Sequence, residues 1–201
     1  MYKTVKRIFG LLVLCVACIG SVQASLLSDC LARLEQSTLR ANITLSIASD
    51  ATQPLNYTGT LVMCGERFHV TILDYDAAYD GQTLSIYAED TDELTLSHPS
   101  TDELAEINPF VYARELIKVC NIVESTRTIT LTPKDASHEI DRFVLRLNDQ
   151  LDPISLELKE GKKLTTVTLR AMDNQPLVSE SVKGESFSIS PRSTTYINDL
   201  R

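Results

Sequence analysis

The chain has 201 residues, of which 43% are hydrophobic and 23% are charged, and it contains no tryptophan. This length is sufficient for one domain with a sizeable core. The formal net charge is −8 at pH 7. Such an acidic balance argues against nucleic acids and anionic lipid headgroups as the main partners of the protein.

The N-terminal residues have the composition of an export signal. Three basic side chains lie within residues 3–7, and residues 8–19 form an apolar run that is too short to span a bilayer. Small side chains then lead up to Ala24, which predicts a cleaved signal peptide over 1–24 and a single domain over 25–201. The alternative is a lipoprotein signal, in which Cys18 would become the lipid-modified N-terminus.

The cysteines do not form a disulfide framework. The pair at 15 and 18 lies in the apolar signal core, which excludes a redox or metal role for it. The predicted mature chain keeps Cys30, Cys64 and Cys120, so at most one disulfide can form and one thiol stays free. Three buried free thiols are the other interpretation of this set.

The hydrophobic period changes from helical to strand-like near the start of the mature chain. Over Ser25–Ala41, Leu27, Leu31 and Leu34 lie on one helical face, which predicts an N-terminal helix. Beyond it, apolar and polar residues alternate as in half-buried antiparallel strands. The apolar members are Ile43, Leu45 and Ile47, then Phe68, Val70 and Ile72, then Ile129 and Leu131, then Phe143, Leu145 and Leu147, then Val167 and Leu169.

Turn signals between these segments bring the expected number of strands to about ten. Residues 99–120 interrupt them with a helical pattern, in which Asn108 is suited to capping and Pro109 to the first turn. The predicted fold class is α+β: a strongly curved antiparallel sheet, or incomplete half β-barrel, covered by the N-terminal helix and a mid-chain helical lid.

No pattern of catalytic or metal-binding residues is present. His69, His98 and His138 are not spaced with other metal ligands, and His69 is predicted to be solvated on the polar side of its strand. The chain has no G-x-S-x-G elbow or phosphate-binding glycine loop, and its carboxylates cluster at turns. We therefore expect no catalytic residue, no metal and no cofactor, with a hydrolase as the least favoured alternative.

The order of several segments resembles the periplasmic outer-membrane lipoprotein carriers, the LolA-like family. These segments are the Asp-Gly hairpin at 80–87, the helix opened by Asn-Pro at 108–116, the strand end at 131–134, and the C-terminal stretch from 187 to 201. The resemblance implies a half-barrel whose apolar groove holds the acyl chains of lipoproteins, or a related lipid, during transfer to the outer membrane. It also implies a monomer that meets an inner-membrane donor complex and an outer-membrane acceptor.

The resemblance and the strand phases together give the expected groove residues. They are Leu61, Met63, Phe68, Val70, Ile72, Leu84 and Ile86 on the sheet, with Phe110, Leu116 and Ile117 on the lid. The alternative function is a periplasmic protein-interaction or envelope-stress sensor module of the same fold. A permanent core is the alternative role for the lid.

The chain departs from the family at one functional position. In the family, an Arg-Pro pair follows the strand that corresponds to residues 59–61, and this arginine ties the lid to the sheet. Here Gly65 or Cys64 occupies that position, and Arg67 is shifted in phase. The sequence therefore predicts a lid that is held by apolar contacts alone and opens easily.

Overall fold

The computed structural model describes residues 25–49, 52–172, 175–180 and 186–201. The predicted cleavage after Ala24 and the alternative lipidation at Cys18 concern residues outside these ranges. The helices are α2 (Leu26–Gln36), α3 (Thr101–Ile107) and α4 (Pro109–Val119). In the part of the chain that the structure describes, no helix is long and apolar enough to cross a membrane.

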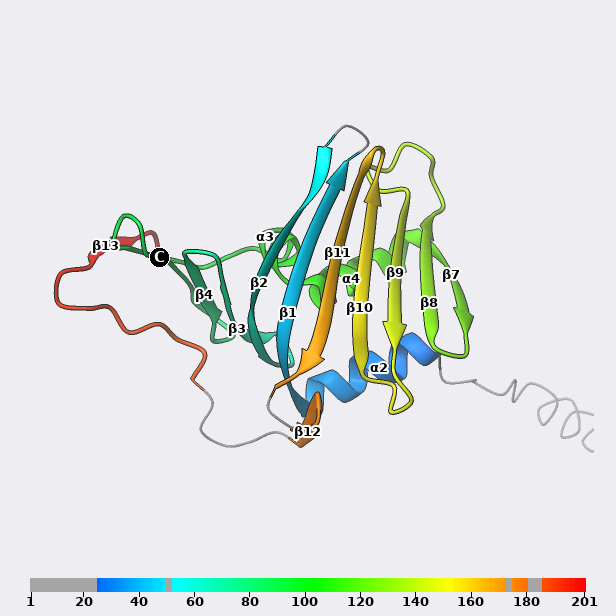
Figure 1. Cartoon of the computed structure of the whole chain (residues 1–201), viewed down its shortest axis with the longest axis horizontal. Coiled ribbons are helices and arrows are strands. Elements are labelled where there is room, and N and C mark those ends of the chain that lie inside the picture. The colour runs from blue at the N-terminus through cyan, green and yellow to red at the C-terminus, as the bar shows by residue number, and fades with distance from the viewer. Residues whose placement is uncertain (1–24, 50–51, 173–174, 181–185) are drawn as a thin grey trace, which may run out of the picture.

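One large sheet, antiparallel except at its β13 edge, makes up most of the molecule (Figure 1). Its order is β13-β6-β5-β4-β3-β2-β1-β11-β10-β9-β8-β7, and β12 pairs with β1 beside β11. The strands are β1 (Ser37–Ser49), β2 (Thr52–Cys64), β3 (Arg67–Ile72), β4 (Tyr75–Tyr79), β5 (Leu84–Ala88), β6 (Glu93–Ser97), β7 (Cys120–Ser125), β8 (Thr128–Pro133), β9 (Arg142–Leu147), β10 (Pro153–Glu160), β11 (Lys163–Ala171), β12 (Val178–Glu180) and β13 (Tyr196–Asp199).

The predicted fold class is confirmed: the sheet is open and strongly curved, and the three helices lie on one of its faces (Figure 1). We call this face the inner face. The sheet has 13 strands rather than about ten. The short β12 and β13, of 3 and 4 residues, show no alternation long enough to be recognised.

The N-terminal helix is shorter than predicted, because it ends at Gln36 instead of Ala41. Residues 37–39 pair with β12, and residues 38–47 pair with β2. Leu39 and Ala41 are fully buried in the strand, and Ala41 also falls on the helical face of Leu27 and Leu34, so the helical pattern runs on into β1. Tertiary pairing overrides the local preference here.

The Asp-Gly hairpin has the predicted position between β4 and β5. Asp80 Oδ1 accepts hydrogen bonds from the backbone N–H groups of Gln82 and Thr83 at 2.8 and 2.7 Å. Gly81 has φ +103°, a left-handed conformation that favours glycine. The turn chemistry of this segment therefore fixes the hairpin locally.

The core lies between the inner face and the helices. Buried leucines of α2 pack together with buried side chains of β1, β2, β8, β9 and α4 in one cluster. Cys30, Cys64 and Cys120 are all buried thiols outside any disulfide. The interpretation of these cysteines as small buried hydrophobes is therefore confirmed, and no disulfide joins them.

The C-terminal segment crosses the outer face of β3 and β5 before it reaches the sheet edge. The Arg67 guanidinium stacks over the Phe187 ring at 5.0 Å, and the Arg192 guanidinium lies 5.6 Å from the Tyr87 ring centre. β13 then pairs in parallel with β6. The sheet is therefore covered on its inner face by helices and, at β3–β6, on its outer face by the end of the chain.

Candidate functional site

The predicted groove residues of the sheet lie on its inner face in regular rows. Met63, Phe68 and Leu84 belong to one row with Tyr79, since each is directly opposite its neighbour across β2–β5. All four are buried, with exposed fractions of 1–7%. This row is part of the core under the helices.

Exposure increases row by row along the same strands. In the next row, Leu61, Val70, Ala77 and Ile86 lie opposite one another and are only partly buried. Ile72, one row further, is also partly buried, and Tyr75 opposite it is 50% exposed. We call Leu61, Val70, Ile72, Ala77 and Ile86 the apolar strip.

The apolar strip is continuous with the core, and yet it keeps contact with solvent. All its members are aliphatic, so its side chains offer no hydrogen-bonding group to a ligand. A surface of this kind is suited to an apolar chain laid along the rows. The pairing of the strands thus brings the sheet members of the predicted groove together on one face.

The predicted lid consists of two helices that meet at Asn108. α3 begins with a capping box, in which Ser100 Oγ accepts from the Glu103 N–H and the Glu103 carboxylate accepts from the Ser100 N–H. α4 begins at Pro109, and Asn108 Oδ1 accepts hydrogen bonds from the N–H groups of Phe110 and Val111 at 3.0 and 3.3 Å. The predicted cap at Asn108 and the position of Pro109 are confirmed.

The lid side chains pack into the core. Phe110 and Leu116 are buried, and Ile117 is partly buried against the same cluster. Tyr112 contacts Phe143 of β9 edge to face, with ring centres 6.3 Å apart. α4 therefore shares apolar contacts with the sheet, as the sequence predicts.

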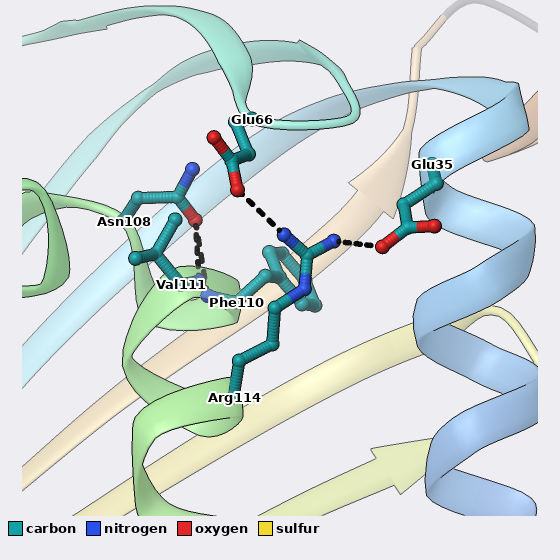
Figure 2. Close-up of polar contacts among 6 residues, drawn as sticks. All are labelled: Glu35, Glu66, Asn108, Phe110, Val111 and Arg114. Atoms are coloured by element: carbon teal, nitrogen blue, oxygen red, sulfur yellow. Dashed lines mark hydrogen bonds and ion pairs between the residues drawn. The ribbon is translucent and has the colours of Figure 1, made fainter. Parts of the chain in front are cut away.

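The prediction of a lid held by apolar contacts alone is wrong. Figure 2 shows Arg114 of α4 between Glu35 of α2 and Glu66 of the β2–β3 turn. Its guanidinium donates to Glu35 Oε1 at 2.8 Å and to Glu66 Oε1 at 3.0 Å. We call these three residues the Arg114 latch. The arginine is placed on the lid rather than on the sheet, which is why the strand sequence around residues 62–68 gives no sign of it.

A second polar contact holds the start of α2. Ser25 Oγ and the N–H groups of Leu26 and Leu27 all donate to the carboxylate of Glu124 on β7, at 2.6–3.0 Å. Burial alone would raise the pKa of Glu124, but these hydrogen bonds outweigh it and hold the pKa below its ordinary value. Farther along α2, Arg33 pairs with the buried Asp152 at 2.8 Å.

No catalytic arrangement accompanies the apolar strip in the described part of the chain. Within those residues, no three side chains of His, Cys, Asp or Glu come together to hold a metal ion. Burial, with a smaller effect of Asp152, raises the pKa of Cys30 to about 12, which keeps this thiol protonated. His69 is half-buried and lies 2.8 Å from Asp76 on the outer face, so it is paired rather than simply solvated as predicted.

No protein-family model matches the chain, and no curated protein matches it in sequence. Solved structures are similar in fold. An uncharacterized conserved protein from Thermus thermophilus has 9% identity and a TM-score of 0.55, over 87% of this chain and 96% of that protein.

Two further structures bear names of the expected type. A LolA superfamily protein from Nitrosomonas europaea has 10% identity and a TM-score of 0.37, over 74% of this chain and 94% of that one. A putative outer membrane lipoprotein-sorting protein domain from Vibrio parahaemolyticus has 8% identity and a TM-score of 0.41, over 80% and 92%. Likeness at these identities shows the fold alone: an open, curved sheet with helices on one face, which is the architecture that the sequence predicts.

Proposed function

We propose that this protein is a periplasmic carrier that binds acyl chains of lipoproteins, or of a related lipid, on its inner face. The observation that carries the proposal is the apolar strip, a set of aliphatic side chains that continues the core and still contacts solvent. A protein that needed only stability would gain by covering these side chains completely. Their partial exposure supports a surface that is completed by a ligand.

The driving force is the removal of acyl methylene groups from water. Each buried methylene contributes about 0.8 kcal/mol, so contact with a few methylenes already gives useful affinity. The strip provides no group that reacts with the ligand, so binding is non-covalent and reversible. We propose that an inner-membrane donor complex loads the protein and that an outer-membrane acceptor unloads it by offering a better apolar site.

The lid gives this exchange a structural basis. Displacement of α4 would uncover part of the core cluster in which Phe110 and Leu116 are buried and against which the apolar strip packs. The Arg114 latch opposes that displacement through two partly exposed ion pairs. Such pairs are weak, typically about 0.2–1 kcal/mol each, and they therefore suit a lid that closes and reopens.

Substitution of Ile72 by aspartate tests the proposal. Ile72→Asp places a charge on the apolar strip at a position already in contact with water, and we expect it to weaken binding of a fluorescent fatty acid at least tenfold. The matched control is Thr58→Asp, which places the same charge at an exposed position on the opposite face of β2. Fluorescence titration measures the affinity, and thermal unfolding shows whether each variant still folds cooperatively.

Two outcomes would contradict the proposal. If purified wild-type protein binds neither fatty acids nor acylated peptides, the strip is not a lipid site. If Ile72→Asp abolishes cooperative unfolding, Ile72 is an ordinary core residue, and the apolar strip is part of the core rather than a surface for a ligand. Mass spectrometry of ligands that copurify with the protein from the periplasm gives the independent identification of the cargo.

A further inference from the structure

Asn108 holds a buried hydrogen-bond donor that has no partner. The residue is 3% exposed, and its side-chain nitrogen Nδ2 makes no hydrogen bond. Among the described residues, one other buried side-chain atom lacks a hydrogen bond, Asp152 Oδ1, and this atom is ion-paired with Arg33 at 2.8 Å. Of these two atoms, Asn108 Nδ2 is therefore the one left with no polar interaction.

Every other polar atom of Asn108 is satisfied. Its backbone N–H donates to the Leu104 carbonyl at 2.8 Å, and its carbonyl accepts from the Tyr112 N–H at 3.0 Å. Its Oδ1 accepts from the N–H groups of Phe110 and Val111. Rotation of the amide by 180° would replace these two acceptor contacts by N–H facing N–H, so the oxygen and nitrogen positions are fixed by chemistry.

The free nitrogen points away from α4, on the side where Glu66 lies (Figure 2). Its neighbours along the chain are apolar and buried: Leu104 on α3, and Phe110 and Val111 on α4. An unsatisfied donor in such surroundings is costly, and proteins rarely keep one without a function. The two lid helices meet at this residue, and its neighbours Leu104 and Phe110 belong to the core cluster against which the apolar strip packs.

We infer that Asn108 is the polar anchor for the head of an acyl ligand, its Nδ2 donating a hydrogen bond to the carbonyl oxygen at the end of the chain. This inference rests on the proposed function and specifies the ligand chemistry further. A hydrocarbon tail satisfies the apolar strip but leaves Nδ2 without a partner. An acyl group brings one sp² oxygen at the end of its apolar chain, which is the acceptor that the amide lacks.

The anchor gives the site a direction. The carbonyl binds at the junction of α3 and α4, and the chain extends from there over the inner face. Two sources supply this chemistry, an acyl ester or amide as in a lipid-modified protein, and the carboxylate of a free fatty acid. Both carry an sp² oxygen at the same end of the chain, and a saturated ether of equal length carries none.

Three fluorescent probes of equal chain length distinguish these ligands: a glycerol ester, a free fatty acid and an alkyl ether. We expect the wild-type protein to bind the better carbonyl probe about tenfold more tightly than the ether. The identity of that better probe, ester or acid, names the source. Equal affinity for all three probes would overturn the role of Asn108 and leave the proposed carrier function intact, whereas failure of every probe to bind would overturn both.

Two substitutions test the residue itself. Asn108→Asp and Asn108→Ser each keep an oxygen that caps α4, and only the first adds a charge. We expect both to lose the preference for the carbonyl probe and to keep the affinity for the ether within about twofold. Asn42→Asp, on the exposed outer face of β1, is the matched control and should retain the preference.

A spectroscopic measurement on the wild-type protein avoids the question of whether the variants fold. The two side-chain N–H resonances of Asn108 should move on addition of the carbonyl probe and stay in place with the ether. If these resonances respond equally to both probes, or if folded Asn108 variants keep the carbonyl preference, the anchor does not exist.

Discussion

Removal of the Arg114 guanidinium should open the lid without unfolding the protein. Arg114→Met keeps the apolar stem of the side chain and removes both ion pairs, to Glu35 on α2 and to Glu66 in the β2–β3 turn. Both pairs join α4 to elements outside the lid. The buried contacts of Phe110 and Leu116 are unchanged by the substitution.

The magnitude follows from the exposure of the three groups. The Arg114 side chain is 24% exposed, and those of Glu35 and Glu66 are 54% and 57% exposed. Solvent screening at this exposure limits the combined contribution of the two ion pairs to the free energy of lid closure to about 1 kcal/mol. If the latch acts only on the closed lid, its loss raises the open fraction about fivefold.

Hydrogen exchange measures this fraction directly. Amides of α3 and α4 should exchange about fivefold faster in Arg114→Met, with amides of β1 and β11 unchanged. Lys118→Met is the matched control, because Lys118 lies on the same helix and pairs with Glu115 of that helix. Salt at 1 M, where the Debye length falls to about 3 Å, should accelerate the wild type and leave Arg114→Met unaffected.

Two results of the exchange measurement would contradict the prediction for Arg114→Met. If exchange accelerates equally in α4 and in the central strands, the substitution has lowered global stability, and α4 is a fixed part of the core. If exchange does not change at all, the latch contributes nothing to closure. In either case the proposed carrier mechanism would need another gate, and the inference from the latch to lid opening would be refuted.

Three further predictions concern stability and processing. Glu124→Gln should lower the free energy of unfolding by about 1 kcal/mol at pH 7. Because folding lowers the pKa of Glu124, the stabilising effect of the carboxylate is complete above its ordinary pKa of 4.5 and disappears as the pH falls through the folded-state pKa. Chemical unfolding curves of the variant and the wild type should therefore converge in acid. Gly59→Ala should destabilise by about 1–3 kcal/mol in urea unfolding, because the added Cβ would lie 2.1 Å from the Thr71 carbonyl oxygen, whereas Thr60→Ala beside it should change stability far less. Intact-mass analysis of the exported protein should give Ser25 as the N-terminus, and a diacylglyceryl group on Cys18 would instead indicate a membrane-anchored acceptor.

Local chemistry explains which parts of the fold the sequence predicts well. The predicted alternating sets at Phe68–Ile72 and Phe143–Leu147 fall within β3 and β9, because each shows clear alternation between flanking turns. The cap at Asn108 is predicted correctly because it depends on neighbouring residues only. The end of α2 is not, because Ala41 satisfies the helical period of Leu34 while its actual partners are Leu61 and Ala171.

The candidate site was predicted less completely than the fold. Strand phase is enough to place Val70 and Ile72 on one face of β3, since side chains alternate along each strand. That Leu61 of β2 shares this face follows only from the strand pairing. The burial gradient along the rows depends on where the helices lie, which no local pattern records. Arg114 and Glu35 are 79 positions apart, and their contact exists only after α2 and α4 have packed on the same sheet.

The last strand, β13, covers a sheet edge at β6 that lies far from it in the sequence. Asp92, next to the start of β6, accepts a hydrogen bond from Thr195, which lies 103 positions later. Until β13 emerges, β6 is an open edge with unpaired backbone groups, of the kind that promotes association between chains. Contacts of such high contact order form slowly and late. The pairing of β13 with β6 is therefore expected to protect this edge only in the late steps of folding.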